Sequence, residues 1–140
     1  MEQANDLTRF INAQAGNYHS ALSEVRKGKK RSHWMWYIFP QIKGLGFSET
    51  SKFYAIQNLD EAAAYLHDPV LGKRLVEISK ALLNLPGSSA YQIFGSPDDM
   101  KLRSSMTLFA AVPGADAVFQ TVLDKYFNGS PDTATLRLIS

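Results

Sequence analysis

Apolar residues recur every three or four positions along most of this chain, which is the spacing of one buried helical face. The clearest case lies between Asp68-Pro69 and Pro86-Gly87. Proline and glycine at these places fit the start and the stop of a helix, so the pattern predicts one long helix there. Its apolar positions are Val70, Leu71, Leu75, Ile78, Leu82 and Leu83.

Further apolar stripes, each with a capping or breaking residue at its end, predict more helices. Alternation typical of strands is nearly absent, and no repeat or interdomain linker stands out. The sequence therefore predicts one all-α domain over residues 1–140, a compact orthogonal bundle of about seven short helices. The other expected helices are 6–15, capped by Asp6; 17–27, ended by Gly28; 48–56, capped by Ser48; 58–66, with Asn58 and Glu61 as a capping box; 88–94, opened by Ser88; 96–111, capped by Ser96; 116–127, begun by Asp116; and a short final helix around Leu136.

The aromatic segment 33–39 departs from this pattern, because it shows neither a helical stripe nor clean alternation. A short, almost fully buried helix is favoured, ended before Pro40 because the residue that precedes a proline avoids the helical region. A strand is the alternative. The following segment 41–47 contains Gly44-Leu45-Gly46 and is expected to be a loop that can approach a ligand closely.

Composition narrows the class of protein. Hydrophobic residues make up 45% and charged residues 20%, which are ordinary values for a folded globule. No apolar stretch approaches the roughly 20 residues that cross a bilayer, and the start lacks a signal-peptide pattern, so we expect a cytoplasmic protein without a membrane partner. The chain has no cysteine, which excludes disulfides and thiolate nucleophiles, and its three histidines lack ligand-like spacing. We therefore expect neither a metal nor a cofactor.

Positive charge is concentrated in one place. The formal net charge is only +2, too low for a surface that attracts nucleic acid over its whole extent. Five of the six residues from Arg26 to Arg31 are cationic, however, and this run leads directly into the aromatic segment. It is either a helix end whose cations complement the helix dipole or a binding patch for an anion.

Aromatic rings beside cations suit the wall of a ligand pocket, whereas a core alone could be built from aliphatic residues. At least half of the rings are expected in the core, while Trp34 or Trp36 could stack a flat ligand. His33 follows the cations, and both positive neighbours and burial favour its neutral form, which can accept a proton or hydrogen-bond a ligand. The plainer alternative is that His33 fixes a backbone carbonyl.

The predicted helix 96–111 is unusually polar in its first half. Its Ser104 and Ser105 are mediocre helix formers, and their hydroxyls could bond back to the preceding turn or hold a ligand. If this helix packs against the aromatic segment, Lys101 would join Lys30 around one anion, with His33 beside them.

Known catalytic motifs are absent: the chain has no nucleophile elbow, zinc helix, phosphate-binding loop or dinucleotide fingerprint. Acid–base chemistry by Glu24 or Asp99 stays open, because a carboxylate enclosed by aromatic rings can acquire a raised pKa. Asp99 is also spaced for a surface ion pair with Arg103. The catalytic candidates are His33, Glu24 and Asp99, and the ligand-binding candidates are Lys30, His33, Trp34, Trp36, Gln41, Lys101, Ser104 and Ser105.

The most specific string in the chain is Lys30-Arg31-Ser32-His33-Trp34-Met35-Trp36-Tyr37-Ile38-Phe39-Pro40-Gln41. Together with Arg9-Phe10, Leu45-Gly46 and the segment 98–109, it resembles the bacterial and fungal family catalogued as domain of unknown function 1810. The resemblance spans nearly the full chain and implies a small, mostly α-helical domain with no established activity; some members carry the label calpastatin. A looser similarity links Phe10-x-x-Ala13-Gln14 and the basic–aromatic features to helical domains that process ADP-ribose adducts.

These features favour one hypothesis and leave two alternatives open. The first is a domain that binds, and could hydrolyse, a phosphate-bearing nucleotide or ADP-ribose-like ligand in a basic–aromatic pocket. The second is a protein-interaction module that docks an acidic partner through residues 26–31. Weak binding of single-stranded nucleic acid is the least favoured. The sequence does not decide between binding and catalysis, nor whether segments 30–41 and 98–107 share a pocket.

Overall fold

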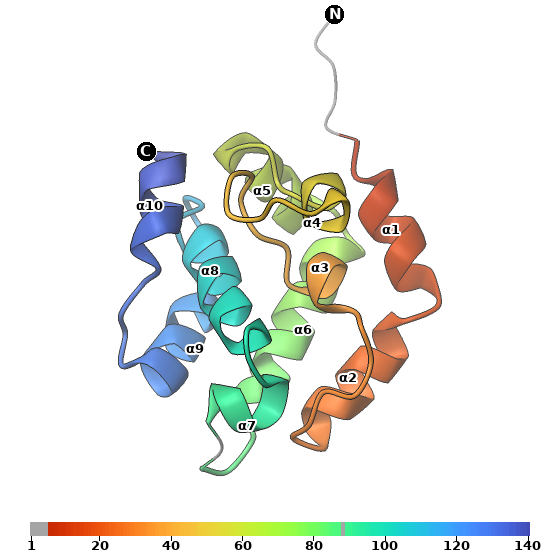
Figure 1. Ribbon diagram of the computed structural model, residues 1–140, viewed down its shortest axis with the longest axis vertical. Coiled ribbons are helices and arrows are strands. Elements are labelled where there is room, and N and C mark those ends of the chain that lie inside the picture. Colours follow the sequence, from red (N-terminus) through yellow and green to blue (C-terminus); the bar gives the residue numbers. More distant parts are fainter. Residues whose placement is uncertain (1–5, 88) are drawn as a thin grey trace, which may run out of the picture.

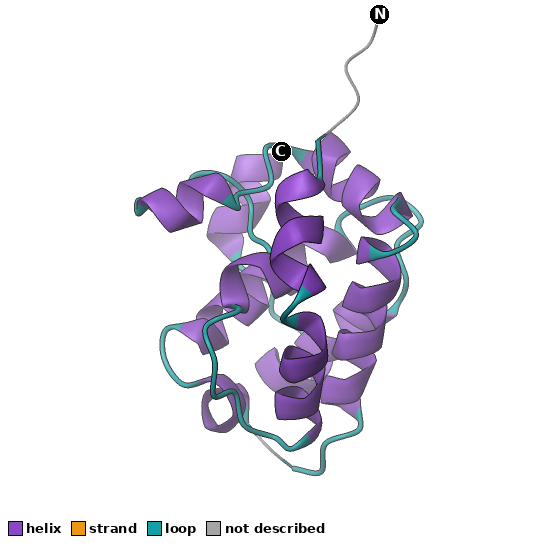
Figure 2. Ribbon diagram, turned by 90° about the vertical axis from the view of Figure 1, so that its right-hand side faces the viewer, coloured by secondary structure: helices purple, strands orange, loops and turns teal. Residues whose placement is uncertain are grey.

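The computed structural model describes residues 6–87 and 89–140, and within these ranges there are ten helices and no strand (Figures 1 and 2). Seven of the helices have seven residues or more, and the other three are very short, so the predicted all-α bundle of about seven short helices is confirmed. The elements are α1 (Thr8–Ala15), α2 (Tyr18–Arg26), α3 (Met35–Ile38), α4 (Glu49–Phe53), α5 (Leu59–His67), α6 (Leu71–Leu83), α7 (Ala90–Phe94), α8 (Asp98–Ala110), α9 (Val118–Phe127) and α10 (Thr133–Ile139).

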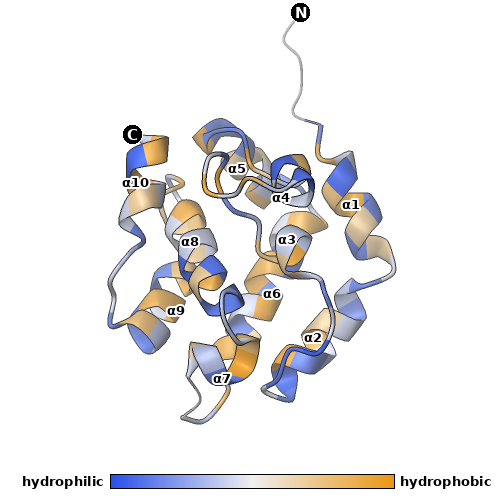
Figure 3. Ribbon diagram, in the orientation of Figure 1, coloured by the Kyte–Doolittle hydropathy of each residue, from blue (hydrophilic) through white to orange (hydrophobic). Residues whose placement is uncertain are grey.

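A hydrophobic core lies between the helices. α6 packs against α2, α5 and α9, and α8 packs against α5, α7, α9 and α10 (Figure 1). Rings fill part of the core: Tyr65 contacts Phe10 edge-on and also Phe109, which in turn contacts Phe119. Each buried side chain of this size contributes about 1.5–3 kcal/mol to folding. The mixture of apolar and polar residues along each helix is visible in Figure 3. None of the described helices is long and apolar enough to span a membrane.

Local signals set several helix ends where the sequence predicts them. Ser48 accepts a hydrogen bond from Ser51 N–H at 3.1 Å, and Asn58 accepts one from Glu61 N–H at 2.9 Å, so both predicted N-caps are confirmed. Gly28 follows the last turn of α2 with a φ of 79°, a left-handed conformation that favours glycine.

At the starts of α7 and α8, the N-cap positions are held by Ser89 and Pro97. Ser96 does not cap α8, because Pro97 occupies the N-cap position and no side chain caps the helix there. The expected opening residue Ser88 lies outside the described residues. Its neighbour Ser89 caps α7 in a reciprocal capping box with Gln92.

The predicted helix 48–56 is wrong in its last three residues. α4 ends earlier, and Ile56 forms an isolated parallel bridge with Ile42. Ile56 N–H donates to Gln41 O at 2.8 Å, and Lys43 N–H donates to Ile56 O at 2.8 Å. Because Ile56 is fully buried, core packing holds this stretch out of a helix and ties it to the preceding loop.

The aromatic segment contains the short helix α3, so the predicted helix is confirmed and the strand alternative is wrong. α3 ends at Ile38, and Phe39 has left the helical conformation before Pro40, as expected for a residue that precedes proline. Trp34, Met35, Ile38 and Phe39 are at most 2% exposed. This segment is therefore mainly core, and it packs against α1.

Candidate functional site

The two tryptophans of the aromatic segment have different surroundings. Trp34 is 1% exposed, and its indole N–H donates to Glu24 Oε1 at 2.9 Å. Its ring packs edge-on against Phe94. Trp36 is only half-buried and lines a surface cavity. Of the two, Trp36 is therefore the ring that a ligand can reach.

Glu24 holds the chain at the start of the aromatic segment. Its Oε1 accepts hydrogen bonds from the backbone N–H groups of Arg31 at 2.7 Å and Ser32 at 2.9 Å, and its Oε2 accepts one from Ser32 Oγ at 2.7 Å. Desolvation alone would raise the pKa of Glu24, but these hydrogen bonds and the one from Trp34 lower it to about 2. The raised pKa that acid–base chemistry by Glu24 would need is not found.

Lys30 and Lys101 meet at the carboxylate of Asp98. Lys30 Nζ lies 3.0 Å from Asp98 Oδ2, and Lys101 Nζ lies 3.4 Å from Asp98 Oδ1. Lys101 Nζ also lies 3.6 Å from the centroid of the Trp36 ring, and Lys30 Nζ lies 5.2 Å from that of Trp34. The structure thus brings the aromatic segment and the start of α8 together.

Asp98 is a residue that the sequence interpretation missed. Its spacing to Lys101, three positions apart on one helix, is visible in the sequence, whereas its pairing with the distant Lys30 is not. One carboxylate between two ammonium groups neutralises part of their charge. Both lysines are consequently engaged with the protein itself through Asp98.

The remaining candidates on α8 also make internal contacts. Ser104 Oγ donates to Met100 O at 3.2 Å, so its hydroxyl bonds back to the preceding turn of the helix. Ser105 is fully buried, and its hydroxyl has no hydrogen-bond partner among the described residues. Asp99 accepts a hydrogen bond from Met100 N–H at 2.9 Å, while Arg103 binds the loop before α10. The expected Asp99–Arg103 ion pair is therefore wrong.

A cavity of about 440 Å³ opens beside Trp36. We call it the Trp36 cavity. Its volume lies in the range of small-molecule sites, and its surface is mostly apolar. Of the predicted binding residues, Trp36 and Gln41 line it, whereas His33 is exposed and does not. The rest of the lining comes from residues 42–47, from Ser51, Lys52 and Tyr54, and from Ala55 and Gln57.

The glycine-containing loop forms one wall of the Trp36 cavity and packs closely on its neighbours. A Cβ on Gly46 would lie 2.6 Å from Ser51 Oγ, so a side chain there would displace α4 or the loop. Gly44 has a φ of 109°, and a Cβ there would lie 3.1 Å from Leu138 of α10. Phe47 follows at the rim, where it is 84% exposed.

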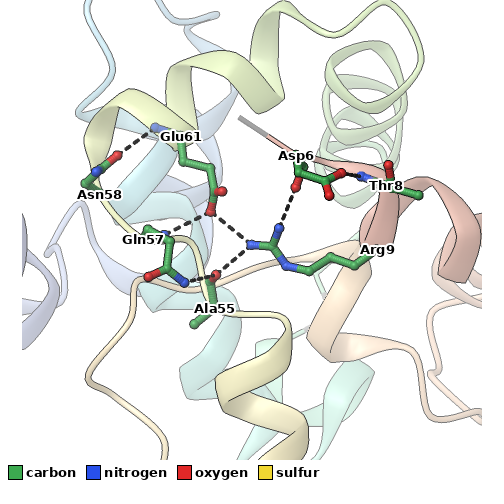
Figure 4. Close-up of polar contacts among 7 residues, drawn as sticks. All are labelled: Asp6, Thr8, Arg9, Ala55, Gln57, Asn58 and Glu61. Atoms are coloured by element: carbon green, nitrogen blue, oxygen red, sulfur yellow. Dashed lines mark hydrogen bonds and ion pairs between the residues drawn. The ribbon is translucent and has the colours of Figure 1, made fainter. Parts of the chain in front are cut away.

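The wall formed by Ala55 and Gln57 is fixed by an arginine from α1 (Figure 4). Arg9 donates to Ala55 O and to Glu61 Oε1, both at 2.9 Å, and Glu61 Oε1 also accepts from Gln57 N–H at 2.9 Å. The Glu61 side chain therefore binds Arg9 and Gln57 instead of reaching back to Asn58, so only half of the predicted capping box forms.

Two lysines carry the charge of the Trp36 cavity. Lys43 and Lys52 are exposed, and neither forms an ion pair within residues 6–87 and 89–140. The described lining holds no carboxylate and no imidazole, but Gln41 and Gln57 offer amides and Ser51 a hydroxyl. An aromatic ring, amide groups and uncompensated positive charge together suit a flat anionic molecule.

Two other hollows are lined by basic side chains. One, of about 570 Å³, lies where Lys29 and Lys30 face α7. The other, of about 410 Å³, lies between α2 and α6 and includes Arg26. The basic run is thus divided between separate surfaces. In the part of the chain that the structure describes, no group of three or more acidic or histidine side chains could hold a metal ion.

Comparison with known proteins yields a family and a solved relative. The family model described as "Protein of unknown function (DUF1810)" matches residues 4–139. The crystal structure of the conserved hypothetical protein Rv1873 from Mycobacterium tuberculosis is similar to this chain, with 48% sequence identity, a TM-score of 0.94 and 96% of each chain covered. No curated protein matches the chain. These relatives support the fold and name no activity.

Proposed function

This chain belongs to the DUF1810 family of proteins of unknown function, and we propose that it binds a planar, phosphate-bearing small molecule, a nucleotide or an ADP-ribose-like ligand, in the Trp36 cavity. The observation that carries the proposal is the position of Trp36 in an apolar cavity that also holds Lys43 and Lys52, with no carboxylate in its described lining. A base needs an aromatic or apolar surface, and phosphates need uncompensated cations.

Trp36 supplies the surface for the base. Lys101 Nζ lies 3.6 Å from the ring centroid and so covers one part of the indole, and Trp36 also lines the cavity. Stacking of a base on such a ring contributes about 1–3 kcal/mol. Phe47, exposed at the rim, offers a second ring that can close over a bound base.

Lys43 and Lys52 supply the charge for phosphate. Lys43 lies in the glycine-containing loop and Lys52 on α4, so two separate elements each bring a lysine to the lining of the cavity. Charge-assisted hydrogen bonds to phosphate are about twice as strong as neutral ones. Gln41 and Gln57 complete the polar set with amides that can bond a ribose or a base edge.

The proposal is one of binding and does not include hydrolysis. His33, Glu24 and Asp99 do not line the Trp36 cavity, and Glu24 is a fully engaged carboxylate. The described lining therefore offers no imidazole or carboxylate to take up a proton from water.

Calorimetric and fluorescence titrations with ADP-ribose and AMP test the proposal. We expect ligand binding to quench the fluorescence of Trp36, because Trp34 is shielded in the core. Ribose 5-phosphate, which lacks the base, and adenosine, which lacks phosphate, should each bind at least about tenfold more weakly, a loss of about 1.4 kcal/mol.

A matched pair of variants locates the site. The double variant Lys43→Gln/Lys52→Gln should lower nucleotide affinity about tenfold, whereas Lys73→Gln/Lys80→Gln removes the same charge elsewhere and should leave it unchanged. Absence of both binding heat and thermal stabilisation at millimolar ADP-ribose and AMP would show that the proposal is wrong, as would equal losses in the two variants.

A further inference from the structure

The hollow between α2 and α6, here called the α2–α6 groove, is independent of the Trp36 cavity. Its volume is about 410 Å³, and the two sites share no lining residue. Three exposed cations line it: Arg26 at the end of α2, and Lys73 and Lys80 on α6. None of them forms an ion pair with another described residue. Unpaired cations around a concave surface create a local positive potential.

One carboxylate faces these three cations. Glu77 lines the α2–α6 groove, and its Oε1 accepts a hydrogen bond from the Tyr18 hydroxyl. This oxygen of the Glu77 carboxylate is thereby engaged by Tyr18, and not by Lys73 or Lys80, which lie on either side of Glu77 along α6. The described lining keeps an excess of two positive charges, from three cations and one anion.

Apart from the charged residues and the amide of Asn84, the α2–α6 groove is lined by apolar residues, which together form what we call its apolar floor. Val76, Ala81 and Leu85 line it, and the last two are buried. An aliphatic side chain of a ligand can pack on this surface, and burying it there makes a favourable contribution to the free energy of binding.

The C-terminal end of α6 would ordinarily repel an anion, because its last carbonyls carry partial negative charge. Here they are engaged: Lys125 Nζ donates to Leu82 O at 3.3 Å and to Leu83 O at 3.0 Å, and the Tyr126 hydroxyl donates to Leu82 O at 2.5 Å. Lys125 Nζ also donates to Leu85 O. The ammonium group therefore offsets the negative end of α6 next to the groove.

From this combination we propose that the α2–α6 groove docks an acidic segment of a partner protein, with an aliphatic side chain of that segment on the apolar floor and flanking carboxylates on Arg26, Lys73 and Lys80. Charge complementarity selects the acidic segment, and the floor selects the aliphatic side chain. Of the basic run 26–31 only Arg26 takes part, because the other two cations come from α6.

A nucleic acid fits the α2–α6 groove less well. Its described lining has no aromatic ring on which a base could stack, and single-strand binding relies on such rings. A phosphate backbone has no aliphatic group that could pack on the apolar floor, whereas a leucine side chain can.

Fluorescence anisotropy with a labelled peptide built from the unit Glu-Leu-Asp-Glu tests this proposal at low salt. We expect the peptide to bind. Replacing its leucines by serine, or its acidic residues by their amides, should each weaken binding about tenfold or more, because the floor and the cations both contribute. The protein variant Lys73→Gln/Lys80→Gln should weaken binding about tenfold, while Lys43→Gln/Lys52→Gln should not.

Far-UV circular dichroism of both double variants checks that they are folded. The variant Arg26→Gln leaves α6 untouched and tests peptide binding to the same groove through its third cation. No peptide binding overturns the proposal, and so do equal binding of the serine peptide or equal loss in both double variants. Tighter binding of a single-stranded oligonucleotide than of the peptide also overturns it. Each lysine pair serves as the control for the other. The peptide proposal and the nucleotide proposal can therefore be disproved independently of each other.

Discussion

Glu24 and Asp98 show how single carboxylates organise the surroundings of the aromatic segment. Glu24 accepts hydrogen bonds from two backbone amides, a hydroxyl and an indole, so it anchors the chain on both sides of His33. Asp98 joins Lys30 to Lys101, and Lys101 then lies against Trp36. These residues place Trp36 at the cavity without themselves facing a ligand.

The variant Glu24→Gln should lower the free energy of unfolding at pH 7 by about 1–2 kcal/mol, because an amide accepts fewer and weaker hydrogen bonds than a carboxylate. The pKa of Glu24 is about 2 in the folded protein, below its ordinary value of 4.5. Its contribution is therefore fully present above pH 4.5 and is lost as the pH falls towards 2.

Urea unfolding of wild type and variant across this pH range measures the effect. The difference between the two proteins should shrink on acidification. Glu49→Gln, an exposed position at the start of α4, should change stability by only a few tenths of a kcal/mol. If the difference in free energy of unfolding between wild type and Glu24→Gln is as large near pH 2 as at pH 7, the prediction is wrong.

Helices and the loops between them respond to different constraints. The long helices carry their own capping signals and apolar stripes, whereas the walls of the Trp36 cavity depend on contacts between elements. Gly46 lies against Ser51 of α4, and the bridge between Ile42 and Ile56 joins the loop to the segment after α4. Arg9 then holds that segment from α1.

Substitution Gly46→Ala should destabilise the protein by about 1–3 kcal/mol, because the new Cβ would meet Ser51 and force the loop away from α4. Ser51→Gly removes the obstructing side chain. In a double-variant cycle followed by urea unfolding, the combined loss should therefore be smaller than the sum of the two single losses. Strict additivity would mean that the close approach does not constrain the loop.

Every helix except α4 and α10 contributes buried side chains to one continuous hydrophobic cluster, and Ile139 of α10 packs against its margin. The chain from 6 to 87 and from 89 to 140 thus shares a core. A core of this kind unfolds as a unit in small proteins. That the whole chain is one domain stays a prediction, which cooperativity can test.

Urea unfolding followed by far-UV circular dichroism and by tryptophan fluorescence should give coincident, single transitions. The first signal reports all helices, and the second is dominated by Trp34 in the core and Trp36 at the cavity. Local helices and the central core should be lost together, because they share the same buried contacts. Two separated midpoints would contradict a single cooperative domain.

The sequence pattern predicts the candidate site only in part. It selected Trp36 and Gln41, which line the Trp36 cavity, but it passed over Lys43, Lys52 and Gln57 because isolated polar residues carry no local signal. It also could not separate Trp34 from Trp36. Two positions apart in one short segment, they have the same composition around them, yet one is in the core and one at the surface.

The sequence by itself determined the helical class and most helix positions, because caps such as Asn58, the stop at Gly28 and the apolar stripes act through neighbours a few residues away. Only the tertiary structure decided the bridge at Ile56, the pairing of Asp98 with Lys30 and the cavity beside Trp36. Each of these depends on which distant surfaces meet when the core closes. Such long-range contacts are determined by the packing of the whole chain, and the spacing of residues close together in the sequence does not predict them.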